Sequence, residues 1–137
     1  MLRDTERTQE AENAFRRAVA IHEKLVAEFP TAENERSRLA TYLGELTETL
    51  LRQGKHAEAA KVAEKVAGVI PEDSNGYRRA ADFFSRCVPL AEKDAALPQA
   101  DRTKVAKRYA DRSQELTSEA DKRTGEKPAA PGQKPKQ

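Results

Sequence analysis

Apolar residues recur along most of this chain at intervals of three and four positions, which is the period of one face of an α-helix. Runs of β-branched and aromatic residues, which would indicate strands, are missing. Pro or Gly interrupts the helical pattern near residues 30, 54, 71 and 98. The pattern therefore predicts an all-α fold of about five helices, joined as antiparallel hairpins.

The breaks define the predicted elements. Helices are expected at about residues 8–29, 31–53, 55–69, from 73 onwards, and from Leu97-Pro98 to about 123. Thr31 is predicted to cap the second helix, Gly54 to supply a left-handed turn, and Pro89 to kink or end the fourth helix. We expect one helical domain at 8–123, and a disordered tail at 124–137 because that segment has almost nothing to bury.

The apolar stripes also predict the core. The first helix carries a stripe at spacings of three and four: Ala11, Phe15, Ala18, His22, Leu25 and Phe29. Over the whole chain we expect these large side chains to be mostly buried: Phe15, Leu43, Leu46, Leu50, Tyr77 and Phe84. In the fifth helix Gln114 and Thr117 stand where apolar side chains are expected, which predicts a loosely packed final hairpin.

A repeat register underlies these stripes. Counted from position 40, packing residues fall at repeat positions 4, 7, 8, 11, 20, 24, 27 and 32, namely Leu43, Leu46, Thr47, Leu50, Ala59, Ala63, Val66 and Pro71. A second unit, counted from Ser74, places Tyr77, Ala80, Ala81 and Phe84 at positions 4, 7, 8 and 11. A further offset of 41 residues aligns Phe29-Pro30 with Ile70-Pro71. Helical hairpins of this kind must stack on neighbours to bury their apolar faces.

This register resembles the tetratricopeptide repeat, in the long-helix variety found in kinesin light chains. Residues 14–30 and 77–91 are also similar to phrases in repeat arrays attached to bacterial serine/threonine kinases. The chain has no Gly-rich phosphate loop, His-Arg-Asp or Asp-Phe-Gly sequence, so the catalytic segment of a kinase is not expected. The first predicted helix matches the second helix of a unit, which suggests an incomplete N-terminal hairpin.

The composition narrows the possible functions. Apolar residues make up 37% and charged residues 35%, so the core is expected to be thin. The net charge of +2 is mixed along the chain and disfavours a nucleic-acid binder. One cysteine excludes an intrachain disulfide, and no run is apolar enough to cross a membrane. The first residues lack the apolar segment of a signal peptide, so a cytoplasmic protein is predicted.

Candidate chemistry is scarce. His22 and Cys87 are better explained as a half-buried helix residue and a small core residue than as a metal ligand and a reactive thiol. Glu10 with Glu12, and Glu119 with Asp121, are two positions apart and point in different directions on a helix. The basic stripe of Lys104, Arg108 and Arg112 is expected to be a solvated face. We predict no enzyme activity, no metal and no cofactor.

The resemblance implies a protein-binding groove lined by repeat positions 2, 5, 9, 12 and 13. In this chain those positions hold Thr41, Gly44, Glu48, Leu51 and Arg52, and then Asn75, Arg78, Asp82, Ser85 and Arg86. The Lys and Asn that grip a carboxylate in chaperone-binding repeats are absent from them, so that mode is disfavoured. The predicted partner is a protein or peptide. The alternative is a structural remnant or cap of a larger repeat assembly, without a ligand.

The first helix adds a prediction of its own. Four apolar residues widen its surface beyond a single stripe: Ala14, Val19, Ile21 and Val26. Because few residues precede this helix, we expect part of this surface to remain uncovered. Exposed apolar surface of this kind predicts weak homodimerisation, or capture of a partner helix, through the first helix.

Overall fold

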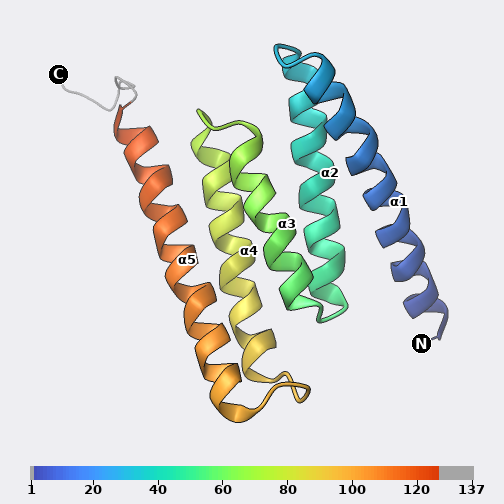
Figure 1. The fold of residues 1–137 in the computed structure, drawn as a ribbon, viewed down its shortest axis with the longest axis vertical. Helices are drawn as coiled ribbons and strands as arrows, with labels where there is room; N and C mark the ends of the chain where they lie inside the picture. The colour runs from blue at the N-terminus through green and yellow to red at the C-terminus, as the bar shows by residue number, and fades with distance from the viewer. Residues whose placement is uncertain (1, 127–137) are drawn as a thin grey trace.

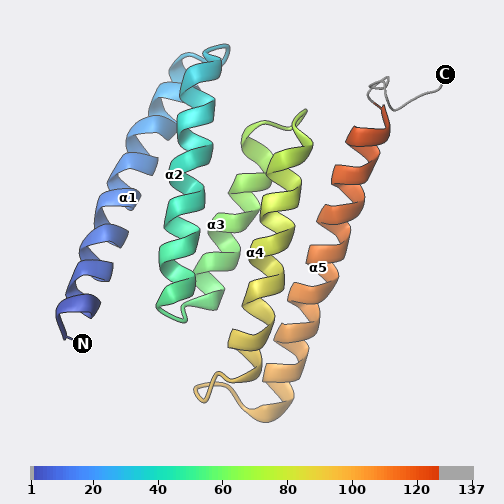
Figure 2. The ribbon, with the colours of Figure 1, turned by 180° about the vertical axis from the view of Figure 1, so that it is seen from behind.

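The computed structural model of the protein describes residues 2–126, which form five helices and no strand. In chain order the helices are α1 (Leu2–Glu28), α2 (Glu33–Arg52), α3 (His56–Val69), α4 (Ser74–Glu92) and α5 (Gln99–Glu126). Successive helices run in opposite directions and form two layers. Helices α1, α3 and α5 lie nearer the viewer in Figure 1, and α2 and α4 lie nearer in Figure 2. The predicted all-α fold of antiparallel hairpins is confirmed.

The helix bounds repeat with the same offset as the sequence. The last residues of α1 and α3 are at positions 28 and 69, and the first residues of α2 and α4 are at 33 and 74. Both pairs are 41 positions apart, which is the offset between the two Pro-containing breaks. Helices α1 and α3 are therefore equivalent members of successive units, as are α2 and α4.

The turns before α3 and before α4 follow local chemistry, and the turn before α2 does not. Gly54 has a φ of 76°, a left-handed conformation that glycine adopts without steric cost. Asp73 caps α4, because its carboxylate accepts a hydrogen bond from the backbone amide of Asn75. The prediction for Thr31 is wrong. Ala32 occupies the capping position of α2, where no side chain accepts a hydrogen bond.

Three predicted bounds also change. Helix α1 begins at Leu2 rather than near Thr8, and α5 continues through Glu126, past the expected bound at 123. Pro89 does not end α4, which continues to Glu92 with Ala91 fully buried. Burial of this last turn in the core outweighs the hydrogen bond that proline cannot donate. The predicted tail lies, from residue 127 onwards, outside the described residues.

The core joins all five helices. Leu43, Leu46, Leu50 and Phe84 are buried as expected, and Phe15 and Tyr77 are partly buried against the same cluster. Ala59, Ala63 and Val66 of α3 belong to the same cluster, so α3 joins the core of α2 to that of α4 and each unit packs on its neighbour.

The final hairpin is packed more closely than the sequence predicts. The exposed fractions of Leu116 and Ala120 are only 1% and 0%. The hydroxyl of Ser113 on α5 donates a hydrogen bond to the backbone carbonyl of Ala81 on α4. Gln114 and Thr117 are exposed, so the packing face of α5 is rotated away from them. The prediction of a loose hairpin was wrong because it placed the wrong side of α5 against α4.

The packing face of α1 is also rotated. Val19, predicted to remain uncovered, is buried with 7% of its surface exposed, and Val26 packs against the core. Phe29, predicted to lie in the buried stripe, is 56% exposed. Ile21 is 58% exposed, in agreement with the prediction. Helix α1 therefore meets α2 through a side that lies between the two predicted apolar surfaces.

Candidate protein-binding groove

A surface hollow of about 440 Å³ is lined by residues of α2 and α4. These are the two helices that lie nearer the viewer in Figure 2. The hollow exists because both helices present their polar sides here while their apolar sides pack towards α3. Eight residues from the two helices line it: Gly44, Glu45, Glu48, Arg78, Arg79, Asp82, Phe83 and Arg86. We call this the α2–α4 hollow.

The hollow contains half of the eight polar residues predicted to bind a partner. Glu48, Arg78, Asp82 and Arg86 line it, together with Gly44 of the implied groove positions. The other four do not line it: Thr41, Arg52, Asn75 and Ser85. Each of these four is exposed elsewhere on α2 or α4.

Sequence reasoning missed three lining residues, Glu45, Arg79 and Phe83. Arg79, Phe83 and Arg86 follow one another at intervals of four and three, so they share one side of α4. This spacing is visible in the sequence. The repeat positions that the resemblance implies, however, include only Arg86 of these three residues.

An ion pair crosses the hollow from α4 to α2. The guanidinium of Arg86 donates to a carboxylate oxygen of Glu48 over 2.7 Å. The hydrogen bond from Arg86 lowers the pKa of Glu48, and the same bond raises the pKa of Arg86. Arg78 is directed instead towards α5, where it donates to Asp121 and Thr124. The Arg86–Glu48 ion pair therefore connects the two helices across the groove, and Arg78 connects α4 to α5.

Two arginines flank the ring of Phe83. The guanidinium carbons of Arg79 and Arg86 lie 5.8 and 6.0 Å from the ring centre, within the range of cation–π attraction. The Arg79 guanidinium also lies directly over Gly44, where a side chain would collide with it. No carboxylate in the described part of the chain forms an ion pair with Arg79. Arg79 therefore lines the hollow without an acidic partner among the described residues.

A second hollow of about 370 Å³ continues the groove beyond Arg86. Leu51, Pro89, Leu90 and Lys93 line it together with Arg86. Its surroundings are mainly aliphatic, in contrast to the charged α2–α4 hollow. The α2–α4 surface thus combines a polar section, an ion pair and an aliphatic section along one line.

A polar cluster of His56, Asp94 and Tyr109 links the start of α3 to the α4–α5 hairpin. His56, the first residue of α3, lies with its Nε2 2.7 Å from a carboxylate oxygen of Asp94 and its Nδ1 2.8 Å from the hydroxyl of Tyr109. The hydrogen bond with His56 lowers the pKa of Asp94, and burial raises the pKa of Tyr109 to about 12. The tyrosine is therefore protonated at neutral pH, and the cluster serves packing. This role of His56 was not predicted from the sequence, because it depends on residues 38 and 53 positions away.

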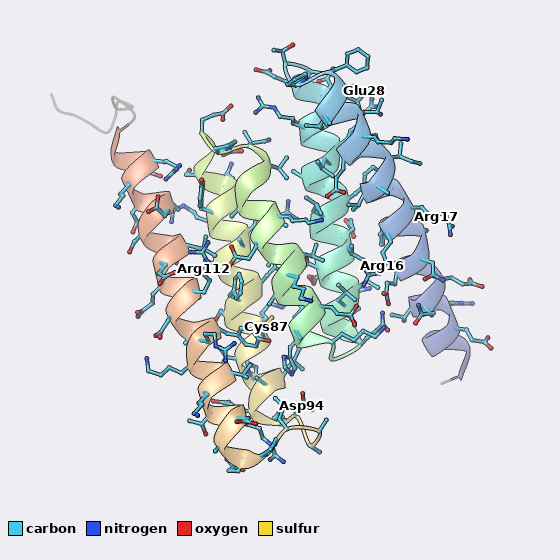
Figure 3. The ribbon with its side chains drawn as sticks, viewed as in Figure 1. Arg16, Arg17, Glu28, Cys87, Asp94 and Arg112 are labelled. Atoms are coloured by element: carbon cyan, nitrogen blue, oxygen red, sulfur yellow. The ribbon has the colours of Figure 1, made fainter. Side chains whose placement is uncertain are left out.

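The other chemical candidates have structural surroundings. Cys87 is fully buried, as predicted, and burial raises the pKa of its thiol to about 11. It lies inside the stack in Figure 3. His22 is half-buried, stacks on Tyr42 and pairs with Glu35. Within the described residues, no three His, Cys, Asp or Glu side chains are grouped as a metal site would require.

One of the three residues of the basic stripe on α5, Arg112, is paired with carboxylates. Arg112 donates to both carboxylate oxygens of Glu64 on α3, over 2.6 and 2.7 Å, and also pairs with Glu115. Lys104 and Arg108 are exposed beside it. No helix among the described residues is long and apolar enough to cross a membrane.

Residues 1–30 match the family model described as tetratricopeptide repeat. The matched segment contains α1 and the first two residues of the turn that follows it, 30 of the 137 residues. No curated protein and no solved structure matched the chain. The family match and the all-helical stack together support a tetratricopeptide repeat protein, a class that generally mediates protein–protein interactions.

Proposed function

We propose that this chain is a non-catalytic protein–protein interaction module, and that the groove between α2 and α4 binds a peptide or a partner helix. The observation that carries the proposal is the ring of Phe83 in the lining of the hollow, with the guanidinium carbons of Arg79 and Arg86 at 5.8 and 6.0 Å from its centre. Aromatic and arginine side chains are enriched where proteins bind one another.

The groove offers complementary groups for a peptide. Arg79 has donors without a carboxylate partner among the described residues, and Asp82 offers acceptors on the next turn of α4. The aliphatic hollow around Leu51 and Leu90 can hold an apolar side chain. A bound segment would then place polar groups in one section and an apolar residue in the next, which fixes its direction along the groove.

A display selection with a random peptide library on the purified protein tests this proposal. Selected peptides are expected to bind saturably to the wild type and to lose most of their affinity with Arg79→Glu or Asp82→Lys. Both side chains are exposed, so these variants should remain folded. Thr117→Lys, on the exposed side of α5, is the matched control and should bind normally.

The alternative is that the chain is a structural remnant or a cap of a larger repeat assembly and has no ligand in the groove. The engagement of Arg78 with α5 and of Arg86 with Glu48 is compatible with this alternative, because those side chains also stabilise the stack. If no selected peptide responds to Arg79→Glu or Asp82→Lys, the groove proposal fails and the alternative gains support.

We propose the long-helix, kinesin-light-chain-like variety, with a bacterial and cytoplasmic setting similar to the kinase-attached arrays. Helices of 27 and 28 residues at the two ends of the stack support the long-helix variety. A scaffold of this kind holds partners by contact alone, without a cofactor.

A further inference from the structure

A second apolar surface, separate from the groove, runs along α1 and just past its end. It consists of residues at spacings of three and four: Ala11, Ala14, Ala18, Ile21, Leu25 and Phe29. We call it the α1 band. None of its members belongs to the buried core, and Ile21 and Phe29 are exposed by 58% and 56%. Exposed surface of this kind on a folded domain marks an interaction site.

The repeat shows how the equivalent surface is used elsewhere in the molecule. Adding the 41-residue offset converts Ala18, Ile21 and Leu25 of the α1 band into positions 59, 62 and 66 of α3. Those positions hold Ala59, Val62 and Val66, whose exposed fractions are 0%, 8% and 2%. The same positions, with similar side chains, are therefore buried in α3, whereas in α1 Ile21 is exposed and Ala18 and Leu25 are only partly buried.

The neighbours of each helix explain the difference. Helix α3 packs between α2 and α4, whereas α1 packs closely against α2 alone among the described helices. The α1 side that meets α2 contains Phe15 and Val19, and its equivalent on α3 begins at His56. His56 contacts Asp94, directly after α4, so that side of α3 faces α4. By elimination, the equivalent of the α1 band on α3 faces α2.

We infer that the α1 band binds an amphipathic helix from a partner protein, packed antiparallel to α1 as α2 packs on α3. Such a helix would carry leucines at intervals of three and four, as α2 does with Leu39, Leu43, Leu46 and Leu50, which are all buried. The band continues the existing core, because Phe15 and Val19 lie on the adjacent side of α1. A bound helix would bury Ile21 in the way that α2 buries Val62.

The charges beside the band favour this partner over a second copy of the chain. An antiparallel pair of α1 helices would match small with large residues, Ala14 with Leu25 and Ala18 with Ile21. In that register, flanking side chains of like charge on the two copies would face one another.

Along one edge of the pair, Glu10 would lie near Glu28 of the second copy, and Arg17 near its Lys24. Figure 3 shows Arg17 on the outer side of α1, opposite the side from which Arg16 reaches α3. None of these four flanking side chains has an ion-pair partner among the described residues. Like charges across an interface oppose association, so a partner helix needs acidic residues opposite Arg17 and Lys24 and basic residues near its ends.

A synthetic peptide of residues 33–52 is the probe, because this α2 segment covers the equivalent surface of α3. Its binding to the purified full chain is measured by fluorescence anisotropy. We expect saturable binding in the micromolar range, weakened about tenfold or more by Ile21→Glu, since a charge would be buried without a partner. Ala14→Glu, a second exposed position of the band, should act in the same way. Thr117→Glu on α5 is the matched control, and circular dichroism verifies that each variant stays helical.

Other outcomes overturn the inference. No saturable binding by the wild type, or undiminished binding by both band variants, would show that the α1 band does not accept this helix. A dimer in sedimentation velocity that Ile21→Glu abolishes would assign the band to a second copy instead. The groove variant Arg79→Glu should leave peptide binding unchanged, so this test and the groove test can fail independently.

Discussion

The two end helices, α1 and α5, each pack closely against one described helix, yet they bury very different surfaces. Helix α5 buries Ala106, Tyr109, Leu116 and Ala120 against α4. Among the described residues of helix α1, only Val19 and Glu12 are buried, while Phe15 and Val26 are partly buried against the core. The number of neighbours therefore does not decide how much an end helix buries.

The difference lies in the arrangement of residues around each helix. The apolar residues of α5 are gathered on one side, and its outward side is polar, as a terminal cap of a repeat stack requires. The apolar residues of α1 occupy two sides, of which α2 covers one. A helix with one apolar side is complete at the end of a stack, whereas a helix with two retains an uncovered surface.

The largest expected effect is on the free energy of unfolding when one leucine in each end helix is truncated to alanine. Leu116→Ala in α5 should lower the free energy of unfolding by ~2–5 kcal/mol, because it leaves a cavity in a fully packed site. Leu25→Ala in α1, which removes a partly exposed side chain, should cost less than about 1 kcal/mol. Urea denaturation measures both. Equal losses would mean that the two end helices are packed alike.

The second effect concerns Glu12 of α1, whose carboxylate accepts hydrogen bonds from Gln53 and Lys55, in the turn after α2. Burial raises the pKa of this carboxyl, but hydrogen bonds from Gln53, Arg16 and Lys55 outweigh burial and lower it to about 2. A lowered pKa stabilises the fold above the ordinary value of 4.5, and that stability is lost as the pH falls towards 2.

We therefore expect Glu12→Gln to cost roughly 2–3 kcal/mol near neutral pH. The difference from the wild type should shrink between pH 4.5 and about 2. Urea denaturation at a series of pH values measures it. Glu10→Gln, at an exposed position of the same helix, serves as the control and should show no such pH dependence. A constant difference across the acid range would contradict the role of the charged carboxylate.

The third effect compares two tyrosines that each contact a histidine. Tyr109→Phe should cost about 1 kcal/mol, because it removes the hydroxyl that His56 contacts in a buried site. Tyr42 stacks its ring on His22 at the α1 end, with ring centres 5.2 Å apart. Tyr42→Phe preserves that stacking and should change stability by less than about 0.5 kcal/mol. Thermal unfolding of the two variants decides whether the polar cluster strengthens only the α5 end.

The smallest effect concerns the ion pairs that join each end helix to α3. Arg112 meets Glu64 through two hydrogen bonds, whereas Arg16 meets Glu58 through one. Both pairs are partly exposed, so we expect double-mutant cycles to give about 0.5–1 kcal/mol for the first and about 0.2–0.5 for the second. Raising the salt concentration should reduce both. A coupling that salt does not change would indicate packing rather than charge.

Much of the fold was predictable because helices and turns depend on local sequence patterns. Helix period, Pro and Gly positions and the 41-residue offset predicted five antiparallel helices and the burial of Leu43, Leu46 and Leu50. The groove was predictable in part, since Glu48, Arg78, Asp82 and Arg86 do line the hollow. Arg79 and Phe83 were not predicted, although their spacing with Arg86 places all three on one side of α4. That this side lines the hollow, with Arg79 over Gly44, depends on how closely α2 approaches α4.

The sequence by itself determined which residues are helical, where the chain turns and which side of α2 and α4 is apolar, because these properties follow from short-range periodicity and turn chemistry. Only the tertiary structure decided which apolar side of α1 is covered, that Pro89 stays within α4, and that His56 joins Asp94 and Tyr109. Those outcomes depend on contacts between residues tens of positions apart. Their free energies come from packing and desolvation, which a local pattern does not contain.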